Sequence, residues 1–308
     1  DDVIKGKRIS GISLSSSGKY AIIHYAYNYG ARSSFSTELY NIKTGKRVII
    51  DTENRKRQLN WMPKSECIYY VQKEGEQTHL ITIHPETLEE TTLIMNIPDE
   101  RFTFSPDEQA LFYSKAEKNT DKKEDIFRLH TLTDRTGGKP AHTFIYRHDL
   151  HTGLTQQLTF GSHATYLNDI NHDGKKILFS ISDETITERP FRKSSMFLLD
   201  IETMHTDTLW KDETFVSRAQ FSPDGKSILI LGAPEAFDGI GLYIGEGQIA
   251  NSYDTQAFLM NLHTKKTEAI TKEFNPSIKN ARWNTSDGLI YLLTEDEDRA
   301  PVYTYNPK

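Results

Sequence analysis

A short phrase of apolar and polar positions returns six times along the chain. Each copy has an apolar residue, a turn rich in Ser, Asn, Pro, Asp or Gly, and then an alternating or fully apolar run; the copies begin at Leu14, Trp61, Phe104, Ile170, Phe221 and Trp283. Pro presets φ in such turns, Asp and Asn bond their own backbone, and Gly accepts positive φ. In the copy at Phe221, the letters SPDG therefore predict a tight hairpin between a strand that ends at Phe221 and the strand KSILIL.

A second phrase follows most copies of the first. It reads as a strand, a turn containing an acidic residue or Asn and often Thr-Gly, and another strand; its copies begin at Glu38, His79, Phe144, Met196 and Phe258. The two phrases together supply four strands per repeat, at the spacing of about 40 to 50 residues that one propeller blade needs. We therefore expect an all-β chain, a β-propeller of four-stranded antiparallel blades that forms a single domain over residues 1–308.

Six repeats are visible, and the last one is incomplete. After "APVYTYNPK" the sequence reaches Lys308 where the outer strand of the sixth blade is expected. The full ring is therefore expected to have six to eight blades.

The connections predicted between second and third strands vary in length, whereas the other hairpin turns are short and uniform. The variable connections are expected at residues 28–36, 116–141, 183–194 and 232–254. One face of the propeller should therefore carry irregular loops, and such faces commonly meet ligands or partner domains. No amphipathic helix is predicted.

Composition and charge exclude several functions. The chain has 37 Lys plus Arg against 43 Asp plus Glu, a net charge of -6, and no recurring basic cluster, so no nucleic-acid partner is expected. The longest apolar runs have strand length, which argues against a membrane span. The single cysteine, Cys67, excludes an internal disulfide. The first residues, DDVIKGKR, do not read as a signal peptide, so a targeting segment is absent or already removed.

No catalytic residue is expected within the chain. A serine hydrolase of the α/β type needs a G-x-S-x-G elbow on a strand-to-helix turn, followed by an Asp and a His. The nearest match, GISLS at Gly11, lacks the closing glycine and lies inside a repeat.

Two segments resemble metal sites without completing one. The segment DINHDG, Asp169 to Gly174, begins like a calcium loop, but Ser180 stands where a bidentate Glu should be, so a hairpin turn is favoured. His142, His148 and His151 could offer imidazoles to a metal, but no acidic or Cys partner has matching spacing, so solvated histidines near a turn are favoured. We expect no metal and no cofactor.

The connection predicted in the fourth blade is the candidate substrate-binding segment. Its sequence, DETITERPFRK, places Glu184 and Glu188 beside Arg189 and Arg192. Carboxylates could hold the amine of a peptide, and guanidinium groups could hold a carboxylate or carbonyl. The alternative is an ordinary solvated loop whose charges pair with one another.

Taken together, the six copies of the FSPDGK type and the segment DLHTGLTQQLTFGSH from Asp149 resemble the N-terminal propeller of the prolyl oligopeptidase family of serine peptidases. The likeness is to the dipeptidyl-peptidase and acylaminoacyl-peptidase branches, and it covers essentially the whole chain. The propeller of the periplasmic Tol system shares the same repeat.

This resemblance implies a serine peptidase of dipeptidyl or oligopeptidase type, with a catalytic α/β-hydrolase domain after residue 308. In such proteins the propeller restricts entry to short peptides, and the protein is periplasmic or secreted. The dipeptidyl-peptidase branch uses a double Glu to hold the amine. The adjacent pair here, Glu89 and Glu90, falls in a turn on the opposite face from the variable connections, so that role is not assigned to it.

The sequence therefore predicts a non-catalytic domain that gates access and positions short peptides for a hydrolase domain of the same polypeptide. Whether the protein forms a homodimer is left open. The alternative is a free-standing propeller that binds a protein partner, as the Tol-system protein does. A lectin-like propeller has no supporting group of ligands.

Overall fold

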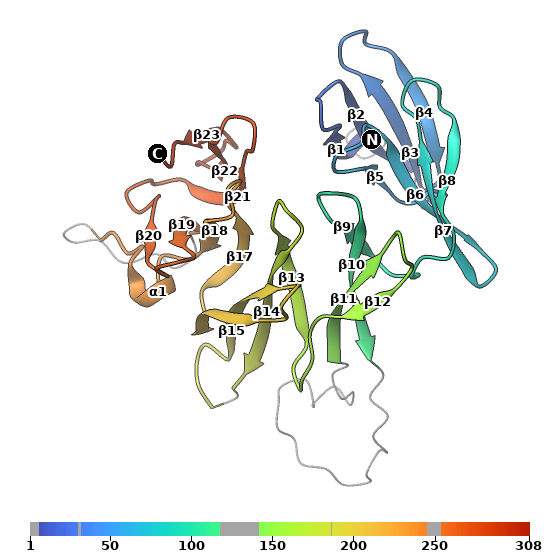
Figure 1. Ribbon diagram of the computed structural model, residues 1–308. Coiled ribbons are helices and arrows are strands. Elements are labelled where there is room, and N and C mark those ends of the chain that lie inside the picture. Colours follow the sequence, from blue (N-terminus) through green and yellow to red (C-terminus); the bar gives the residue numbers. More distant parts are fainter. Residues whose placement is uncertain (1–5, 30–31, 118–141, 186, 245–253) are drawn as a thin grey trace. The chain divides into compact units, whose positions relative to one another are not determined.

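A computed structural model describes residues 6–29, 32–117, 142–185, 187–244 and 254–308, and these form six antiparallel sheets (Figure 1). The first three sheets, here called blades 1 to 3, contain β1 (Lys7–Leu14), β2 (Tyr20–Tyr29), β3 (Arg32–Asn41) and β4 (Arg47–Thr52); β5 (Arg57–Trp61), β6 (Ile68–Glu74), β7 (Gln77–Ile83) and β8 (Glu90–Ile94); and β9 (Phe102–Phe104), β10 (Ala110–Glu117), β11 (His142–Asp149) and β12 (Thr155–Gln157).

Blades 4 to 6 follow in the same order along the chain. They contain β13 (Thr165–Ile170), β14 (Lys176–Glu184), β15 (Arg192–Asp200) and β16 (Thr206–Glu213); β17 (Val216–Phe221), β18 (Ser227–Gly232), β19 (Gln256–Asn261) and β20 (Thr267–Ala269); and β21 (Ser277–Trp283), β22 (Ile290–Glu295) and β23 (Val302–Tyr305). Within each sheet, every strand pairs with the next one in sequence; five blades have four strands and blade 6 has three. The all-β propeller and its incomplete sixth blade are therefore confirmed.

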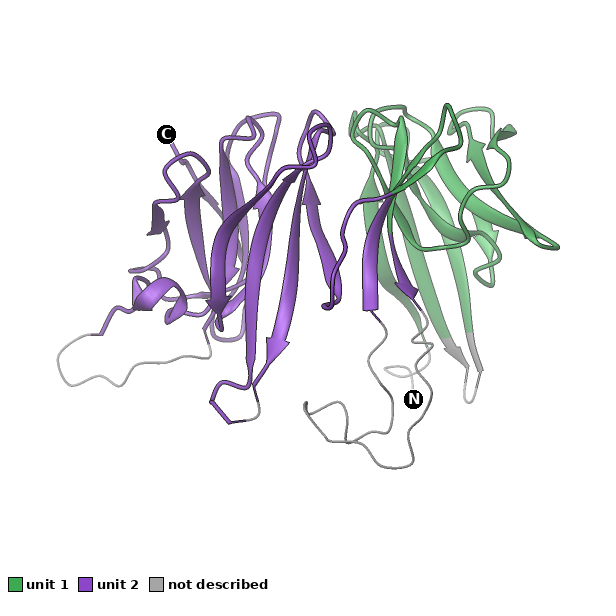
Figure 2. Cartoon of the chain, turned by 60° about the horizontal axis from the view of Figure 1, so that its bottom comes forward, with its two compact units in different colours: residues 1–113, 147–156 green, residues 114–146, 157–308 purple. Residues whose placement is uncertain are grey.

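The chain divides into two compact units, coloured green and purple in Figure 2. The first comprises residues 1–113 and 147–156, and the second comprises residues 114–146 and 157–308. The boundary passes through blade 3. Each unit is described below by itself.

The first recurring phrase folds into the same turn in four blades. A side-chain oxygen at the start of the turn accepts the backbone N–H of the residue five positions later, at 2.8 to 3.2 Å, in the pairs Ser15 with Tyr20, Ser105 with Ala110, Asn171 with Lys176, and Ser222 with Ser227. Gly225 takes the left-handed conformation that this turn requires, and Glu108 occupies the matching position of blade 3 at φ 63°. The predicted hairpin turns are confirmed, including the one in the calcium-like segment.

The second phrase explains the turn between the third and fourth strands. An Asn or Asp side chain accepts the N–H three residues later, at 2.9 Å, in the pairs Asn41 with Thr44, Asp149 with Thr152, Asp200 with Thr203, and Asn261 with Thr264. In blade 2 the imidazole Nδ1 of His84 takes this place and accepts the N–H of Thr87 at 3.3 Å. The acidic or Asn position of the phrase is thus a cap for the turn.

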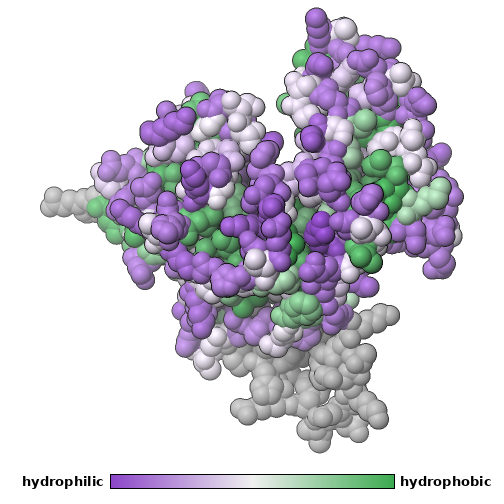
Figure 3. All heavy atoms as spheres, viewed as in Figure 1, coloured by the Kyte–Doolittle hydropathy of each residue, from purple (hydrophilic) through white to green (hydrophobic). Residues whose placement is uncertain are grey.

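The cores lie between the sheets, because the middle strands are apolar on both faces. In the first unit, Ile22 and Ile68 are fully buried in the cluster that joins blades 1 and 2. In the second unit, Ile228 and Phe258 are fully buried where blade 5 packs against blade 4. Each such side chain contributes about 1.5 to 3 kcal/mol of transfer free energy. On the side drawn in Figure 3, hydrophilic side chains dominate the surface, with smaller apolar patches between them.

Side chains also tie neighbouring blades through the backbone of their inner strands. The indole Nε1 of Trp61 donates to the carbonyl of Ser13 at 3.1 Å, and the carboxylate of Asp169 accepts the N–H of Phe221 at 2.7 Å. Burial, only partly offset by this bond, raises the pKa of Asp169. Gln220 donates through Nε2 to the carbonyl of Ala281 at 2.8 Å. Each bond crosses one boundary between blades.

One expectation about the connections needs correction. An irregular connection was expected at residues 28–36, but β2 and β3 pair without interruption up to Tyr29 and Arg32, because the backbone of the Ser-rich stretch completes the ladder. The connection between β18 and β19 contains a short helical turn, α1 (Ala236–Gly239); Phe237 and Asp238 within it have positive φ, so it is not an amphipathic helix, in line with the expectation. The ring of Phe237 in that turn packs edge-on against Trp210, with the centroids 5.5 Å apart. The connection expected at 116–141 lies almost entirely outside the described residues.

Candidate functional site

The charged residues singled out in blade 4 lie where the sequence places them, but they pair with one another or with their neighbours. Glu184 ends β14 and faces Arg192 across the ladder, and the guanidinium donates to its Oε1 at 2.7 and 3.0 Å. Glu188 is paired with Lys193 at 2.7 Å. The guanidinium of Arg189 lies 5.4 Å from the centroid of the Phe191 ring. The described contacts do not bring the four residues to one point, and their role in peptide binding stays a prediction.

The first unit contains a polar pocket of about 510 Å³ that sequence reasoning did not identify. Its walls come from β2, β3 and β4 of blade 1, from β5 of blade 2 and the connection that leads into it, and from residues 99–101 before β9. Because strands alternate in direction within a blade, these connections leave the sheets at the same strand ends as the connection between the second and third strands. The pocket therefore lies on the face where ligand contacts were expected.

Three polar side chains from adjacent strands form one wall of the pocket. The pairing registers place His24 beside Thr37, and Thr37 beside Asp51. Nδ1 of His24 lies 3.0 Å from the hydroxyl oxygen of Thr37. Gly11 stands next to His24 on β1, where a Cβ would lie 3.4 Å from the imidazole Cδ2. Residues paired across neighbouring strands of blade 1 thus hold the imidazole of His24 in place.

Burial lowers the pKa of His24, and the nearby charge of Asp51 offsets this only in part. The ordinary value for a histidine is about 6.5. The imidazole is therefore neutral at neutral pH, and it offers polar atoms to the pocket without a positive charge.

Asp51 is buried, with 8% of its surface exposed, and it lines the pocket. One carboxylate oxygen accepts the backbone N–H of Lys56 at 3.3 Å. The ammonium of Lys56 points elsewhere: it lies 2.6 Å from Glu90 and 4.0 Å from the centroid of the Tyr70 ring. The ammonium of the lysine whose backbone N–H binds Asp51 is therefore committed to blade 2.

Glu90 is held as a structural carboxylate. Burial favours its neutral form, but hydrogen bonds from Lys56 and from the hydroxyl of Tyr70, the latter at 2.7 Å, keep the pKa of Glu90 below its usual value. Both oxygens of this side chain are engaged.

Backbone in unusual conformations surrounds the pocket. Glu53, Asn54 and Gln58 all have positive φ, between 54° and 61°, although none is a glycine. The amide of Gln58 donates to the carbonyl of Glu100 at 2.9 Å and accepts the N–H of Phe102 at 3.3 Å. Such strain persists only where surrounding contacts enforce it, and it is concentrated at functional sites.

The remaining charges divide into paired and unpaired groups. Arg57 and Lys73 both bind the carboxylate of Asp99, at 2.8 and 2.7 Å, and Lys73 first and then Arg57 hold its pKa below the usual value. Arg101 lines the pocket, is exposed, and has no ion-pair partner among the described residues. The pocket can thus offer a buried anion and an exposed cation to a ligand.

Sequence reasoning missed this pocket because its parts are far apart in the chain. Asp51 ends an apolar run, RVIIDT, and nothing in that run distinguishes it from an ordinary residue before a turn. The only local signal is the polar stretch DTENRKRQ, which is longer than the turns inside the repeats.

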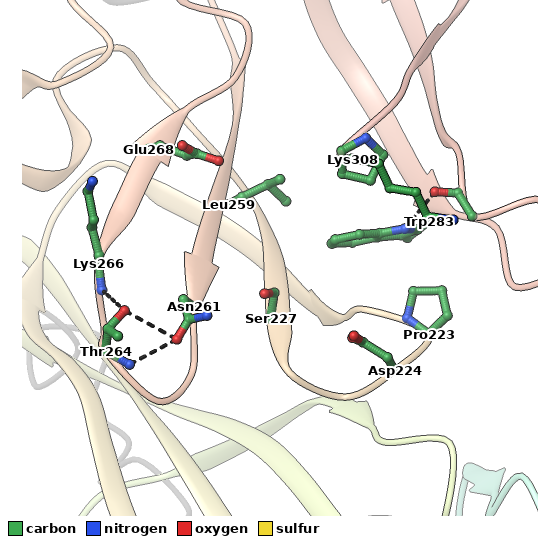
Figure 4. A pocket seen from close by; sticks show the side chains of 12 residues that line it. Pro223, Asp224, Ser227, Leu259, Asn261, Thr264, Lys266, Glu268, Trp283 and Lys308 are labelled. Carbon is green, nitrogen blue, oxygen red and sulfur yellow. Dashed lines mark hydrogen bonds between the residues drawn. The ribbon is translucent and has the colours of Figure 1, made fainter.

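A second hollow, of about 550 Å³, lies in the second unit between blades 5 and 6 (Figure 4). Trp283, Leu259 and Pro223 supply apolar surface. Two of its polar groups already serve the turns: the side-chain oxygen of Asn261 accepts bonds from Thr264, and Asp224 accepts one from Ser222. We therefore regard the pocket in the first unit as the better candidate.

The histidine cluster does not form a site. His151 is exposed, as expected for a turn residue, but the expectation of solvation is wrong for His148, which is 5% exposed in β11. Its Nδ1 lies 2.9 Å from the hydroxyl of Thr155, and burial lowers its pKa. Among the described residues, no group of three His, Cys, Asp or Glu is arranged to hold a metal ion. Within the same residues, no helix has the length and apolar character to cross a membrane.

Comparison with known proteins identifies the fold. No family model and no curated protein matches the sequence. The acylaminoacyl peptidase of Pyrococcus horikoshii is similar over 99% of this chain and 46% of its own, with a TM-score of 0.65 and 13% identity. The propeller domain of the Trilobed protease from Pyrococcus furiosus matches 98% of this chain and 84% of its own, with a TM-score of 0.62 and 14% identity.

A TolB-type protein from Agrobacterium tumefaciens is also similar, over 87% of this chain and 83% of its own, with a TM-score of 0.50 and 14% identity. The chain spans about half the length of the acylaminoacyl peptidase. Its fold is therefore that of the β-propellers found in these peptidases and in TolB-type proteins.

Proposed function

We propose that this chain is the propeller part of a serine peptidase, in which it gates access and positions short peptides for an α/β-hydrolase domain of the same polypeptide. The supporting observation is the likeness to two peptidase propellers over 98% or more of the chain, with one of those peptidases about twice as long. The polar pocket on the loop-bearing face gives such a propeller a place to contact a peptide. As part of this proposal, the protein is periplasmic or secreted.

In this proposed protein, the propeller and the hydrolase domain have separate roles. The propeller supplies surface and charge, and the hydrolase domain supplies Ser, Asp and His. The 308-residue chain should therefore hydrolyse no aminoacyl or acylaminoacyl nitroanilide, whereas the protein extended by the downstream coding sequence should. Both are measured by release of nitroaniline.

Two outcomes would contradict this proposal. One is turnover by the purified 308-residue chain that a serine-directed inhibitor abolishes. The other is a stop codon directly after Lys308, with no G-x-S-x-G motif in the following few hundred codons.

The second candidate is a free-standing propeller that binds a protein partner. The observation that favours it is the TolB-type likeness, which covers 83% of that protein rather than about half. The same reading of the downstream sequence separates the two, because a scaffold needs no hydrolase domain.

A further inference from the structure

Asp51, in the first unit, is a buried carboxylate without a positively charged partner among the described residues. The residue is 8% exposed, and its carboxylate accepts a backbone N–H at 3.3 Å. It forms no ion pair with any Lys, Arg or His of the described parts of the chain. Buried carboxylates are normally paired, because removing the charge from water is costly.

The positive groups around the pocket do not make up for this. Lys56 is bound to Glu90 and lies over the ring of Tyr70, and Arg57 is bound to Asp99. The imidazole of His24 has its Nδ1 beside the hydroxyl of Thr37, and burial keeps it neutral at neutral pH. Arg55, which lines the neighbouring hollow, is bound to Glu53, and the exposed Arg101 forms no ion pair with Asp51 among the described residues. The carboxylate of Asp51 is therefore available to a cation of a ligand.

The space beside Asp51 is large enough for such a group. The pocket measures about 510 Å³, and Asp51 also lines a neighbouring hollow of about 450 Å³. Small-molecule sites commonly have about 300 to 1,000 Å³. An extended peptide spans about 3.3 to 3.6 Å per residue, so the pocket has room for only a few residues.

We propose that this pocket binds the positively charged nitrogen of a short peptide, with the carboxylate of Asp51 as its counter-ion. The exposed guanidinium of Arg101 is available to a carboxylate of the same ligand. The nitrogen comes either from the free amino terminus or from a basic side chain, since an ammonium or guanidinium group makes the same bonds from both. The choice of peptides as ligand class rests on the proposed function; the need for a cation does not.

The test is calorimetric titration of the purified chain with three peptides. These are Gly-Gly-Gly, with a free amino terminus, N-acetyl-Gly-Gly-Gly, without a cation, and N-acetyl-Gly-Gly-Lys, with a cation only on its side chain. We expect saturable binding of the first or the third and none of the second. Which of the two binds identifies the source of the nitrogen.

The Asp51→Asn variant keeps the shape of the side chain and removes its charge. Since a hydrogen bond to a charged group contributes more than a neutral one, its affinity for the cationic peptide should fall about tenfold or more. The matched control is Asp173→Asn, in an exposed turn of blade 4. It should bind as tightly as the unchanged chain.

Thermal unfolding separates a ligand site from a structural carboxylate. The midpoint of Asp51→Asn without peptide should equal or exceed that of the unchanged chain, because the variant removes a buried charge that has no cation. A saturating cationic peptide should raise the midpoint of the unchanged chain and not that of Asp51→Asn.

Three results would overturn the proposal: no cationic peptide binds, Asp51→Asn binds as tightly as the unchanged chain, or Asp51→Asn unfolds at a clearly lower temperature. None of them bears on the proposed function, which depends on the downstream sequence and on turnover. Conversely, a chain that binds these peptides through Asp51 but belongs to no hydrolase would refute the proposed function alone.

Discussion

The pocket beside β4 and the connection between β14 and β15 both contain carboxylates, but these carboxylates differ in burial and in ion pairing. In blade 4, Glu184 is paired with Arg192 and Glu188 with Lys193, and Asp183 lies 2.9 Å from the imidazole Nε2 of His163. In blade 1, Asp51 is more deeply buried than any of these carboxylates and has no such partner in the described chain. A cluster of charges in a sequence therefore does not by itself identify a binding site. The disagreement between burial and pairing is more informative, and only the folded chain reveals it.

The largest effect should come from the strained backbone of the pocket. Replacing Gln58 by Ala removes the amide that joins Glu100 to Phe102 and keeps the unfavourable positive φ, so we expect a loss of about 2 kcal/mol in the free energy of unfolding. Urea unfolding measures it. Arg192→Ala in blade 4 removes a pair in which the arginine side chain is 74% exposed and the Glu184 side chain 15% exposed, and it should cost about 1 kcal/mol.

A matched variant separates the two contributions at Gln58. Gly tolerates positive φ, so Gln58→Gly should be less destabilised than Gln58→Ala, the reverse of the usual order within strands. If Gln58→Gly is as destabilised as Gln58→Ala, or more so, the backbone at this position is not strained. Backbone strain then no longer distinguishes the pocket from the blade 4 connection.

The pocket should also make stability depend on pH. Burial lowers the pKa of His24 in the folded state, so between that value and the ordinary value of about 6.5 the unfolded chain binds a proton that the folded chain does not. The free energy of unfolding should therefore fall as the pH drops from 7 towards 5. Buried His148 adds a change of the same sign.

The His24→Gln variant isolates the contribution of the pocket. Its free energy of unfolding should fall less between pH 7 and pH 5 than that of the unchanged chain, as measured by urea unfolding at both values. An identical fall in both proteins would mean that His24 ionises as freely in the folded state as in the unfolded one.

The smallest effects are expected in the blade 4 connection. Glu188→Ala and Arg189→Ala should leave stability unchanged, because Glu188 is 60% exposed in its pair with Lys193 and Arg189 is exposed beside the ring of Phe191. If the connection touches peptides, the full-length enzyme carrying either change should show a KM for peptide substrates about twofold to fivefold higher, with kcat unaffected. Unchanged kinetics for both variants would remove this connection from the site.

The sequence predicts the blades well because local chemistry determines them. Ser222 and Gly225 define one turn, Asn261 and Thr264 another, and the strands between them are long enough to show their apolar character. The pocket could not be predicted in this way. The burial of Asp51 depends on the pairing of three strands and on residues 99–101, some fifty positions away.

The blade 4 connection falls between these two cases. The sequence correctly brings together Glu184 and Arg192, which face each other across the ladder. The sequence does not reveal that Glu188 pairs with Lys193. Whether Lys193 or a nearby arginine forms this ion pair depends on the exact course of the backbone.

The ties between inner strands have a consequence for how such a chain can evolve. Each tie, such as Trp61 to Ser13 or Asp169 to Phe221, joins a side chain of one blade to the backbone of an adjacent blade. The backbone carbonyl or N–H is present whichever amino acid a mutation introduces at that position. Duplication or loss of a whole blade can therefore leave the remaining boundaries chemically intact, whereas insertions within a blade are tolerated mainly in the connections. New binding loops can thus evolve in the connections while the blades and their cores stay unchanged.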